Sequence, residues 1–322
     1  MASKKKIILI SGAGQLGSRY LQGLSDCKYP LRIYVNDISK AALVNSESLW
    51  SEASHRDDYH EVTFHESPKD IPEQLDLVIN ATTANNRHQI IANISKHSNV
   101  SYWILEKVLA QSEKFIDEIN DAIGYHSKAW VNTPRRIIPW HQAILKKHIL
   151  RSPIHLKLYG GKWGLACNSL HFLDLLAWLS GESLIDIDTN NLNDPWIKAK
   201  REGSWEIYGT LIAKFSGGST AELISEDIDR SNYLYELIDN SGSWIIDEFS
   251  GSAKHSSGFE LPGRIPYQSE MTASLVDEVL EYGTCGLPSL QTSSALHKVF
   301  IVAMLKHWQK HVNNNAAYIP IT

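Results

Sequence analysis

A glycine-rich turn near the amino terminus constrains the fold of this chain more than any other feature. The residues SGAGQLG place Gly12, Gly14 and Gly17 directly after the apolar run at 6–11 and at the start of an amphipathic segment. In this G-x-G-x-x-G spacing the first glycine permits a tight turn, the second admits a ligand close to the backbone, and the third lets helix pack on strand. Alone the pattern is weak, but between a strand and a helix it predicts a βαβ unit that binds a dinucleotide.

Short apolar strands alternate with helical stretches through the first third of the chain. A helix is expected within 112–127, with Ser112 as its N-cap and an apolar face on one side. The expected strands are 6–11, 31–36, 61–65, 75–82, 101–106 and 129–133. This alternation predicts an α/β fold that begins with a doubly wound, parallel Rossmann sheet.

The periodicity changes after about residue 150. The stretch 205–215 alternates apolar and polar residues, and further strand-like runs follow turn signals. This pattern predicts an α+β domain with a large, mostly antiparallel open sheet that has one covered face, followed by a helix over 293–312. We therefore expect a nucleotide-binding domain at 1–130 and a second domain at 131–322.

Composition argues against several classes of partner. The 322 residues include 31 Lys and Arg against 36 Asp and Glu, a formal net charge of −5, so no nucleic-acid partner is expected. No apolar run approaches the roughly 18 residues that a membrane span needs, and none resembles a signal peptide. Cys27, Cys167 and Cys285 lack the spacing of metal ligands or of a disulfide framework, which favours a reducing cytoplasm and no metal site.

The cofactor residues are expected at the carboxyl edge of the parallel sheet. Asp37 ends the second strand 20 residues beyond Gly17, where a carboxylate can accept hydrogen bonds from ribose hydroxyls. It would repel a 2′-phosphate, so NAD is expected, although Lys40 nearby leaves NADP open. Gln15 and Leu16, between the second and third glycines, complete the candidate contacts of this loop.

The loop TTANNRH follows the fourth strand and lies at the same expected edge. Thr82, Thr83, Asn85 and His88 are candidate cofactor contacts because open α/β sheets bind ligands at this edge. Polar residues of this kind also form ordinary loops and helix caps. Both roles remain open from the sequence alone.

The segment ILEKVLA (104–110) places two charged residues in an apolar run after the fifth strand. Lys107 there can donate a hydrogen bond to a substrate oxygen as negative charge develops on it. Glu106 and Lys107 are both grouped with the cofactor contacts. The alternative is a surface ion pair between the two residues.

A second candidate cluster lies at the start of a predicted helix, in the stretch GGKWGLACNSLHFLDLL. A neutral His171 can accept the proton of a hydroxyl group, and Asn168 can bind a substrate hydroxyl or amide. Trp163 is a candidate for stacking on a sugar, although large aromatic residues more often pack in cores. Asp174 can either orient the histidine or face a neighbouring helix.

The order of these features resembles the Gfo/Idh/MocA oxidoreductases over nearly the whole chain. The features are the glycine turn, the acidic end of strand two, a T-x-x-x-x-H loop, a Glu-Lys dipeptide, and H-x-x-D-L opening a helix. The resemblance implies a Rossmann domain and an α+β domain that contributes to substrate binding and to homo-oligomers, as dimers or tetramers. It implies Lys107 and His171 as catalytic residues in NAD(P)-linked oxidation or reduction of a sugar, amino sugar or nucleotide sugar.

The sequence is most similar to members associated with bacterial surface-polysaccharide sugar synthesis, and it departs from the family at two positions. Val108 replaces the proline that follows the lysine, and Cys167 stands where many members have an aspartate. Two other functions therefore stay open. One is an enzyme whose tightly bound NAD oxidises its substrate transiently during elimination or hydrolysis, and the other is a nucleotide-sensing or scaffold protein without catalysis.

Overall fold

The computed structural model describes residues 4–53, 59–147 and 153–322, which form two compact units. The first unit contains residues up to 109 together with 117–132 and 266–290. The second unit contains 110–116, 133–265 and 291–322. Each unit is thus assembled from three segments of sequence, whereas the sequence analysis expected one boundary at residue 130.

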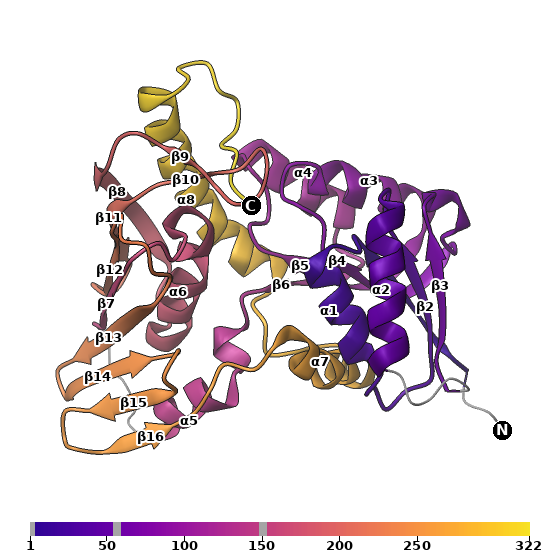
Figure 1. Cartoon of the computed structure of the whole chain (residues 1–322), viewed down its shortest axis with the longest axis horizontal. Helices are drawn as coiled ribbons and strands as arrows, with labels where there is room; N and C mark the ends of the chain where they lie inside the picture. The colour runs from indigo at the N-terminus through magenta and orange to yellow at the C-terminus, as the bar shows by residue number, and fades with distance from the viewer. Residues whose placement is uncertain (1–3, 54–58, 148–152) are drawn as a thin grey trace. The chain divides into compact units, whose positions relative to one another are not determined.

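The first unit is built on a parallel sheet of six strands in the order β3-β2-β1-β4-β5-β6 (Figure 1). The strands are β1 (Lys6–Ser11), β2 (Leu31–Asn36), β3 (Glu61–His65), β4 (Gln74–Asn80), β5 (Asn99–Glu106) and β6 (Lys128–Asn132). The helices that follow or flank them are α1 (Gln15–Leu24), α2 (Lys40–Ala53), η1 (Pro68–Asp70), α3 (Arg87–His97), α4 (Glu113–Ile123) and α7 (Gln268–Tyr282). All six expected strands are present, so the doubly wound Rossmann sheet is confirmed.

The centre of this sheet positions the candidate cofactor loops. Strands β1 and β4 are buried on both faces, as expected for the middle of a parallel sheet. At their carboxyl ends the amide of Ala81 donates to the carbonyl of Ser11 at 2.8 Å, and the amide of Gly12 donates to the carbonyl of Asn36 at 2.8 Å. The glycine turn, the loop after β4 and the end of β2 therefore meet at one edge.

Helix α7 belongs to this unit although it lies late in the sequence. A Cβ atom added to Gly23 of α1 would come within 2.3 Å of the carbonyl oxygen of Ser269, so the two helices pack closely at that glycine. The amide of Lys28 donates to Asp277 at 3.0 Å. These contacts explain why a segment from the last quarter of the chain completes the first unit.

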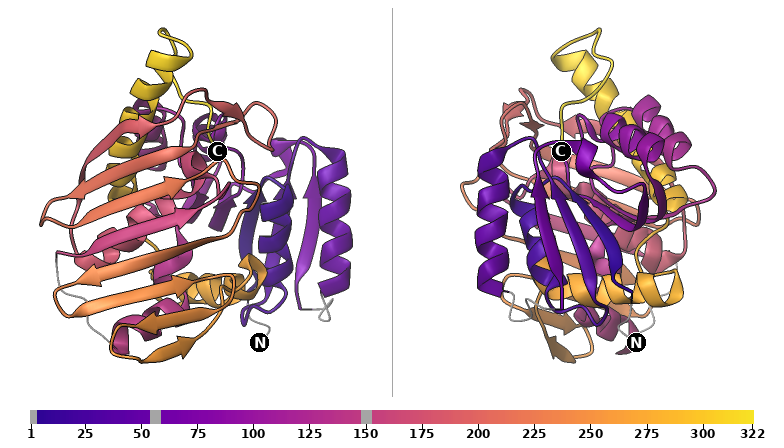
Figure 2. Two further views of the ribbon diagram at one scale, coloured as in Figure 1. Left: turned by 60° about the vertical axis from the view of Figure 1, so that its left-hand side comes forward. Right: turned by 90° about the vertical axis from the view of Figure 1, so that its right-hand side faces the viewer.

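The second unit contains an eight-stranded sheet in the order β16-β15-β14-β13-β7-β12-β11-β8, seen face-on in Figure 2. Its strands are β7 (His155–Gly160), β8 (Leu184–Leu192), β11 (Gly209–Phe215), β12 (Thr220–Ser225), β13 (Tyr233–Asp239), β14 (Gly242–Asp247), β15 (Ser252–His255) and β16 (Glu260–Pro262). Only the β7–β12 pair is parallel. The mostly antiparallel sheet expected from the sequence is confirmed.

One face of this sheet is covered and the other is open. Burial alternates strictly along β7, and α6 (Leu165–Ser180) packs on β12. Three apolar side chains are 37–45% exposed on strands of this sheet, namely Tyr159, Leu234 and Ile245. The other helices of the unit are η2 (Pro134–Ile137), α5 (Pro139–Lys147) and α8 (Leu290–His311), the last of which confirms the helix expected over 293–312.

The expected continuous strand at 205–215 is wrong. The structure divides it into β10 (Trp205–Glu206) and β11, and β10 pairs with β9 (Ile197–Lys198) in a separate two-stranded sheet. Gly209 has a positive φ of 110°, and a Cβ there would lie 2.5 Å from the carbonyl oxygen of Asn191. A glycine was therefore the signal of a break that the apolar alternation concealed.

Helix α4 begins and ends at recognisable residues. The amide of Phe115 donates to the Ser112 hydroxyl at 3.2 Å, which confirms the expected N-cap. The helix stops at Ile123, because Gly124 adopts a positive φ of 65°.

Within the part of the chain that the structure describes, no helix is both long and apolar enough to cross a membrane.

Candidate functional site

The three glycines of the turn have different local surroundings. A Cβ on Gly17 would lie 1.8 Å from the carbonyl oxygen of Gly12, and a Cβ on Gly12 would lie 3.0 Å from the amide nitrogen of Thr82. A Cβ on Gly14 would meet no atom within 4 Å. Gly12 and Gly17 are thus needed for the fold itself, whereas Gly14 leaves open space beside the backbone.

The N-terminus of α1 opens into that space. Gly14 is its N-cap, and no described side chain caps the helix there. Gly14 and Gln15 are exposed and Leu16 is half-buried. Because the first amides of a helix have no partner within it, they can donate to an anionic ligand such as a pyrophosphate.

Asp37 lies beside the same turn. One carboxylate oxygen accepts a hydrogen bond from the amide of Ala13 at 2.7 Å, and the other accepts from the amide of Ser39 at 2.8 Å. The side chain is half-buried, so it is held in place and still reaches solvent. A carboxylate has more lone pairs than these two amides use, so it can still accept from ribose hydroxyls. Next to it, Ile38 is 92% exposed.

Two buried serines that were not predicted from the sequence hold the glycine turn in place through hydrogen bonds to its backbone. The hydroxyls of Ser18 and Ser46 are 2.6 Å apart, and both reach the carbonyl oxygen of Ala13, at 3.0 and 3.2 Å. Ser46 is on α2, so only the fold brings it to the turn. A serine in the middle of an amphipathic helix gave no signal of this role.

The loop after β4 presents three of the predicted cofactor contacts. Thr82 is half-buried and donates to the side chain of Asn80 at 2.7 Å. Thr83 and Asn85 are exposed and hydrogen-bonded to each other. His88, by contrast, is buried in the first turn of α3, with its Nε2 3.8 Å from a carboxylate oxygen of Glu118 on α4.

Arg87 ties this loop to the segment that carries Lys107, and the sequence analysis missed it. The guanidinium is 1% exposed and donates to the carbonyl oxygens of Glu106 at 2.6 Å and Leu109 at 3.1 Å. It also donates to the carbonyls of Thr82 and Val108. The guanidinium group has five N–H donors in one plane, so it can bind several carbonyl oxygens at once. A lysine at this position could not make the same set of hydrogen bonds.

The carboxylate of Glu106 is directed into the first unit. It is 4% exposed and accepts hydrogen bonds from the Tyr20 hydroxyl at 2.6 Å and the Asn132 amide at 2.7 Å. Burial raises the pKa of Glu106, and these donors oppose that change. Glu106 is therefore a buried carboxylate that Tyr20 and Asn132 hold in place, with the charge of Lys107 also lowering its pKa, and it is not a surface group.

Lys107 is half-buried at the carboxyl end of β5, immediately before the buried Val108 and Leu109. The peptide bond between Lys107 and Val108 is cis. The carbonyls on both sides of the lysine accept from Arg87. The backbone that carries the ammonium is therefore well anchored within the first unit.

In the second unit, α6 carries the other candidate residues. The helix begins after Gly164, whose φ is 83°. The side-chain amide of Asn168 donates to the carbonyl of Trp163 at 2.8 Å, and His171 follows one turn later, half-buried. Residues three apart on a helix share a face, so Asn168 and His171 can contact the same ligand.

Glu206 supplies a carboxylate at this helix N-terminus, which the sequence analysis did not anticipate. Its oxygens accept from the amides of Ala166 at 2.8 Å and Cys167 at 3.1 Å. A negative charge at this end of a helix is stabilising. Cys167 is thus adjacent to a carboxylate that comes from β10.

Asp174 faces η2. It forms a bidentate pair with Arg136, at 2.9 and 2.5 Å, and is 2% exposed. One residue earlier, Arg135 pairs with Glu248 and lies 4.2 Å over the ring of Phe172. Of the two roles left open for Asp174, the structure gives it the pairing with a neighbouring element, which anchors the helix that carries His171.

The placement of Trp163 favours packing over ligand stacking. It is 5% exposed, donates its indole N–H to the carbonyl of Ile224 at 2.8 Å, and contacts Phe172 and Tyr233 edge-on. Trp140 and Trp196 are also buried. We therefore do not retain Trp163 among the substrate contacts and keep Asn168 and His171.

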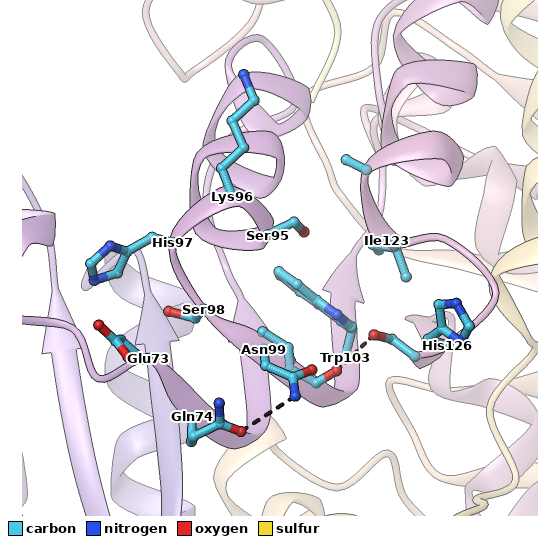
Figure 3. A pocket seen from close by; sticks show the side chains of 13 residues that line it. Glu73, Gln74, Ser95, Lys96, His97, Ser98, Asn99, Trp103, Ile123 and His126 are labelled. Carbon is cyan, nitrogen blue, oxygen red and sulfur yellow. Dashed lines mark hydrogen bonds between the residues drawn. The ribbon is translucent and has the colours of Figure 1, made fainter.

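A cavity in the first unit lies away from the predicted cofactor loops (Figure 3). Its lining includes Gln74 and Asn99, which begin β4 and β5, and the buried Trp103. It therefore opens at the amino ends of the strands. Since open α/β sheets bind nucleotides at the carboxyl ends, this cavity is not the cofactor site.

No protein-family model matches this sequence, and no curated protein matches it significantly. Solved structures do match. UDP-N-acetylglucosamine 3-dehydrogenase from Acidithiobacillus ferrooxidans aligns over 94% of this chain and 97% of its own, with 13% identity and a TM-score of 0.69. Scyllo-inositol dehydrogenase from Lactobacillus casei with NAD(H) and scyllo-inositol aligns over 95% and 98%, with 15% identity and a TM-score of 0.66.

Biliverdin reductase from Synechocystis, in complex with biliverdin and NADP⁺, aligns over 93% of this chain and 98% of its own, with 14% identity and a TM-score of 0.69. At these identities the matches establish the fold. It is the two-part fold that the resemblance to the Gfo/Idh/MocA oxidoreductases predicted. Function is a separate question, because one fold carries many activities.

Proposed function

We propose that this protein is a nicotinamide-dependent oxidoreductase that moves a hydride between its cofactor and a hydroxyl or keto group of a sugar, amino sugar or nucleotide sugar. The observation that carries the proposal is the open space at Gly14, at the uncapped start of α1 and beside a fixed Asp37. Similar proteins support the reaction class, since two are dehydrogenases of a nucleotide sugar and of an inositol.

The residues present fit a dinucleotide. The amides at Gly14, Gln15 and Leu16 would hold the pyrophosphate, and Asp37 would accept from the adenosine ribose. Thr82, Thr83 and Asn85 would line the nicotinamide side, with Glu106 and Arg87 fixing the backbone there. His88, buried against α4, would act through the loop and not by direct contact.

NAD is the expected cofactor. The carboxylate of Asp37 would lie beside the 2′-phosphate of NADP and repel it. Lys40 is exposed three residues later and weakens that preference without reversing it. Relatives of this fold have been crystallised with either cofactor, so the choice rests on this chain's own side chains.

Lys107 and His171 would perform the proton chemistry. In the oxidative direction, the cofactor supplies the hydride acceptor. His171 would take the proton of the substrate hydroxyl as the carbon–oxygen double bond forms, and Lys107 would donate a hydrogen bond to the same oxygen. Asn168 would bind a neighbouring hydroxyl or amide. Because Lys107 belongs to the first unit and His171 to the second, their meeting at one substrate is part of this proposal.

The wider context follows from the same resemblance. We propose a cytoplasmic enzyme of surface-polysaccharide sugar synthesis that works as a homo-oligomer, with its nucleotide-binding domain at 1–130 and its substrate and oligomerisation domain at 131–322. The exposed apolar side chains of the large sheet support an interface, because a partly apolar sheet face is a typical place for subunit contact.

The decisive experiment measures hydride transfer by the purified chain, using NAD or NADP with UDP-N-acetylglucosamine, scyllo-inositol and other sugars. Lys107→Ala should reduce turnover by at least about a hundredfold, as expected for loss of transition-state stabilisation, and leave NAD affinity within a few-fold. Lys96→Ala, an exposed lysine at the opposite edge of the sheet, is the matched control and should keep full activity. Equal activity of the two variants would refute the role of Lys107.

The same assay distinguishes the other two functions. An enzyme that oxidises its substrate only transiently would show reduced nicotinamide bound to the protein but none accumulating in solution. A nucleotide-sensing or scaffold protein would bind NAD and transfer no hydride to any sugar. Net production of free NADH with one class of sugar supports the dehydrogenase.

A further inference from the structure

Three side chains that the proposed reaction does not use lie close together near the carboxyl end of α8, in the second unit. They are His307 and His311 on α8 and Asp194, which follows β8. One potential ligand atom of each lies within 4.8 Å of the other two. More than a hundred residues of sequence separate the aspartate from the histidines, so the cluster exists only in the folded unit.

The geometry of the cluster suits a shared ligand. The histidines are four residues apart on one face of α8, and their rings stack with centroids 4.3 Å apart at an angle of 24°. Nδ1 of His311 lies 2.6 Å from a carboxylate oxygen of Asp194. His307 is buried, whereas the side chains of His311 and Asp194 are 22% and 51% exposed. Solvent therefore reaches the cluster from one side.

Trp196 limits how His307 can act. Its indole N–H donates to Nδ1 of His307 at 3.1 Å. In a neutral ring Nδ1 is then the acceptor and Nε2 carries the proton. A cation that binds His307 must therefore compete with the indole for the one free lone pair of the ring.

We propose that Asp194, His307 and His311 form a site for a divalent transition metal of the zinc class. Two imidazoles and one carboxylate favour Zn²⁺, Ni²⁺ or Co²⁺ over Mg²⁺ and Ca²⁺, which prefer oxygen ligands alone. Three protein ligands leave a fourth position for water. This site lies outside the residues assigned to the cofactor and substrate, and it does not depend on the proposed function.

Only a small movement is needed for the three atoms to bind one ion. Tetrahedral ligands at about 2.1 Å from zinc lie roughly 3.4 Å from one another, so separations of up to 4.8 Å must shorten by up to about 1.4 Å, and the 2.6 Å contact between His311 and Asp194 must lengthen. The exposed side chain of Asp194 can provide that movement. The bound metal would fasten the end of α8 to the connection between β8 and β9 and stabilise the second unit by linkage.

Calorimetric titration tests the site directly. The full chain, freed of any affinity tag and stripped with EDTA, is titrated with ZnCl₂ or MgCl₂. We expect one Zn²⁺ per chain, no Mg²⁺ binding, and a higher unfolding temperature with zinc. His311→Ala and Asp194→Asn, both at exposed positions that should fold, should weaken zinc binding at least tenfold. His126→Ala, which removes an exposed histidine of the first unit, should leave it unchanged.

Two further measurements identify the ligands. Co²⁺ in this site should give a visible spectrum without thiolate charge-transfer bands, which excludes binding by the three cysteines. Trp196→Phe should bind zinc more tightly than the natural chain, because His307 then has no competing donor. The proposal is overturned by absence of zinc binding, by thiolate bands, by unchanged affinity in His311→Ala, or by weaker binding in Trp196→Phe.

Discussion

Two glycines of the same turn should respond in opposite ways to an added methyl group. Gly14→Ala should leave the fold intact and weaken NAD binding, whereas Gly17→Ala should destabilise the fold. The contrast follows from what a Cβ would meet at each position, which is nothing within 4 Å at Gly14 and a carbonyl oxygen at 1.8 Å at Gly17. The pair therefore separates a residue that admits a ligand from one that holds the structure.

For Gly17→Ala the structure sets a lower limit to the cost. An atom at 1.8 Å cannot be accommodated without moving α1 away from the turn, and the carbonyl it meets is backbone. Forced overpacking of this kind costs about 1–3 kcal/mol and sometimes more. At roughly 2–4 °C per kcal/mol for a unit of this size, the unfolding temperature should fall by about 2–12 °C.

For Gly14→Ala the expected loss is in binding alone. Gly14 has φ −63° and ψ −173°, which alanine adopts without strain, so stability should be equal or slightly higher. A methyl group there would keep the pyrophosphate from the first amides of α1. Loss of one hydrogen bond to a charged group costs about 1.5–3 kcal/mol, which corresponds to roughly a tenfold to hundredfold weaker affinity.

The assay combines thermal unfolding without ligand and calorimetric titration with NAD, for the natural chain and both variants. NAD affinity is compared at a temperature where Gly17→Ala is still folded. The reasoning is refuted if Gly14→Ala binds NAD as tightly as the natural chain, since the open space would then not be the pyrophosphate site. It is equally refuted if Gly14→Ala unfolds at a lower temperature than Gly17→Ala.

Three other perturbations have defined outcomes. Asp37→Ser should shift the ratio of NADP to NAD affinity by about tenfold or more toward NADP, measured by titration, because the charge that repels the 2′-phosphate is gone. Arg136→Met should lower the free energy of unfolding in urea by about 3–5 kcal/mol by leaving Asp174 buried without its partner, and adding Asp174→Leu should recover part of that loss. Burial is the largest single influence on the pKa of Glu248 and would raise it, but the charges and hydrogen bonds of Arg135 and His141 together outweigh burial, and the pKa is lowered. The stability from Glu248 is therefore complete above its unfolded pKa near 4.5 and lost as pH falls below it, so Glu248→Gln should flatten the fall of unfolding temperature between pH 6 and 3.

The sequence was sufficient to predict the structural features that depend on a few neighbouring residues. Six short apolar runs became the six strands of the first sheet, with ends that differ by no more than two residues. The N-cap at Ser112 and the glycine turn were recognised because a few neighbouring residues define them. The break at Gly209 was missed because the alternation of 205–215 continued through it.

The residues that support the site were missed because their partners are distant in sequence. Arg87 belongs to the TTANNRH loop, but no neighbouring residue indicates that it binds the carbonyls of Glu106 and Leu109. Glu206 ends the short strand β10 and accepts hydrogen bonds at the start of α6, which begins about 40 residues earlier. The return of α7 to the first unit likewise depends on Gly23, whose partner lies near residue 269. Such contacts depend on how the chain folds in three dimensions, and they produce no periodic pattern in the sequence that could predict them.

The positions of the buried charges offer an independent reason to regard the two segments as functional. Burying a charged group costs several kcal/mol that well-packed apolar residues would avoid. In this chain Arg87 and Glu106 are buried around the backbone of Lys107, and Arg136 and Asp174 pair beside the helix of His171. A sequence shaped by stability alone would be expected to place apolar side chains there. Buried hydrogen-bonded charges give instead a fixed backbone geometry, which the roles proposed above for Lys107 and His171 would each require.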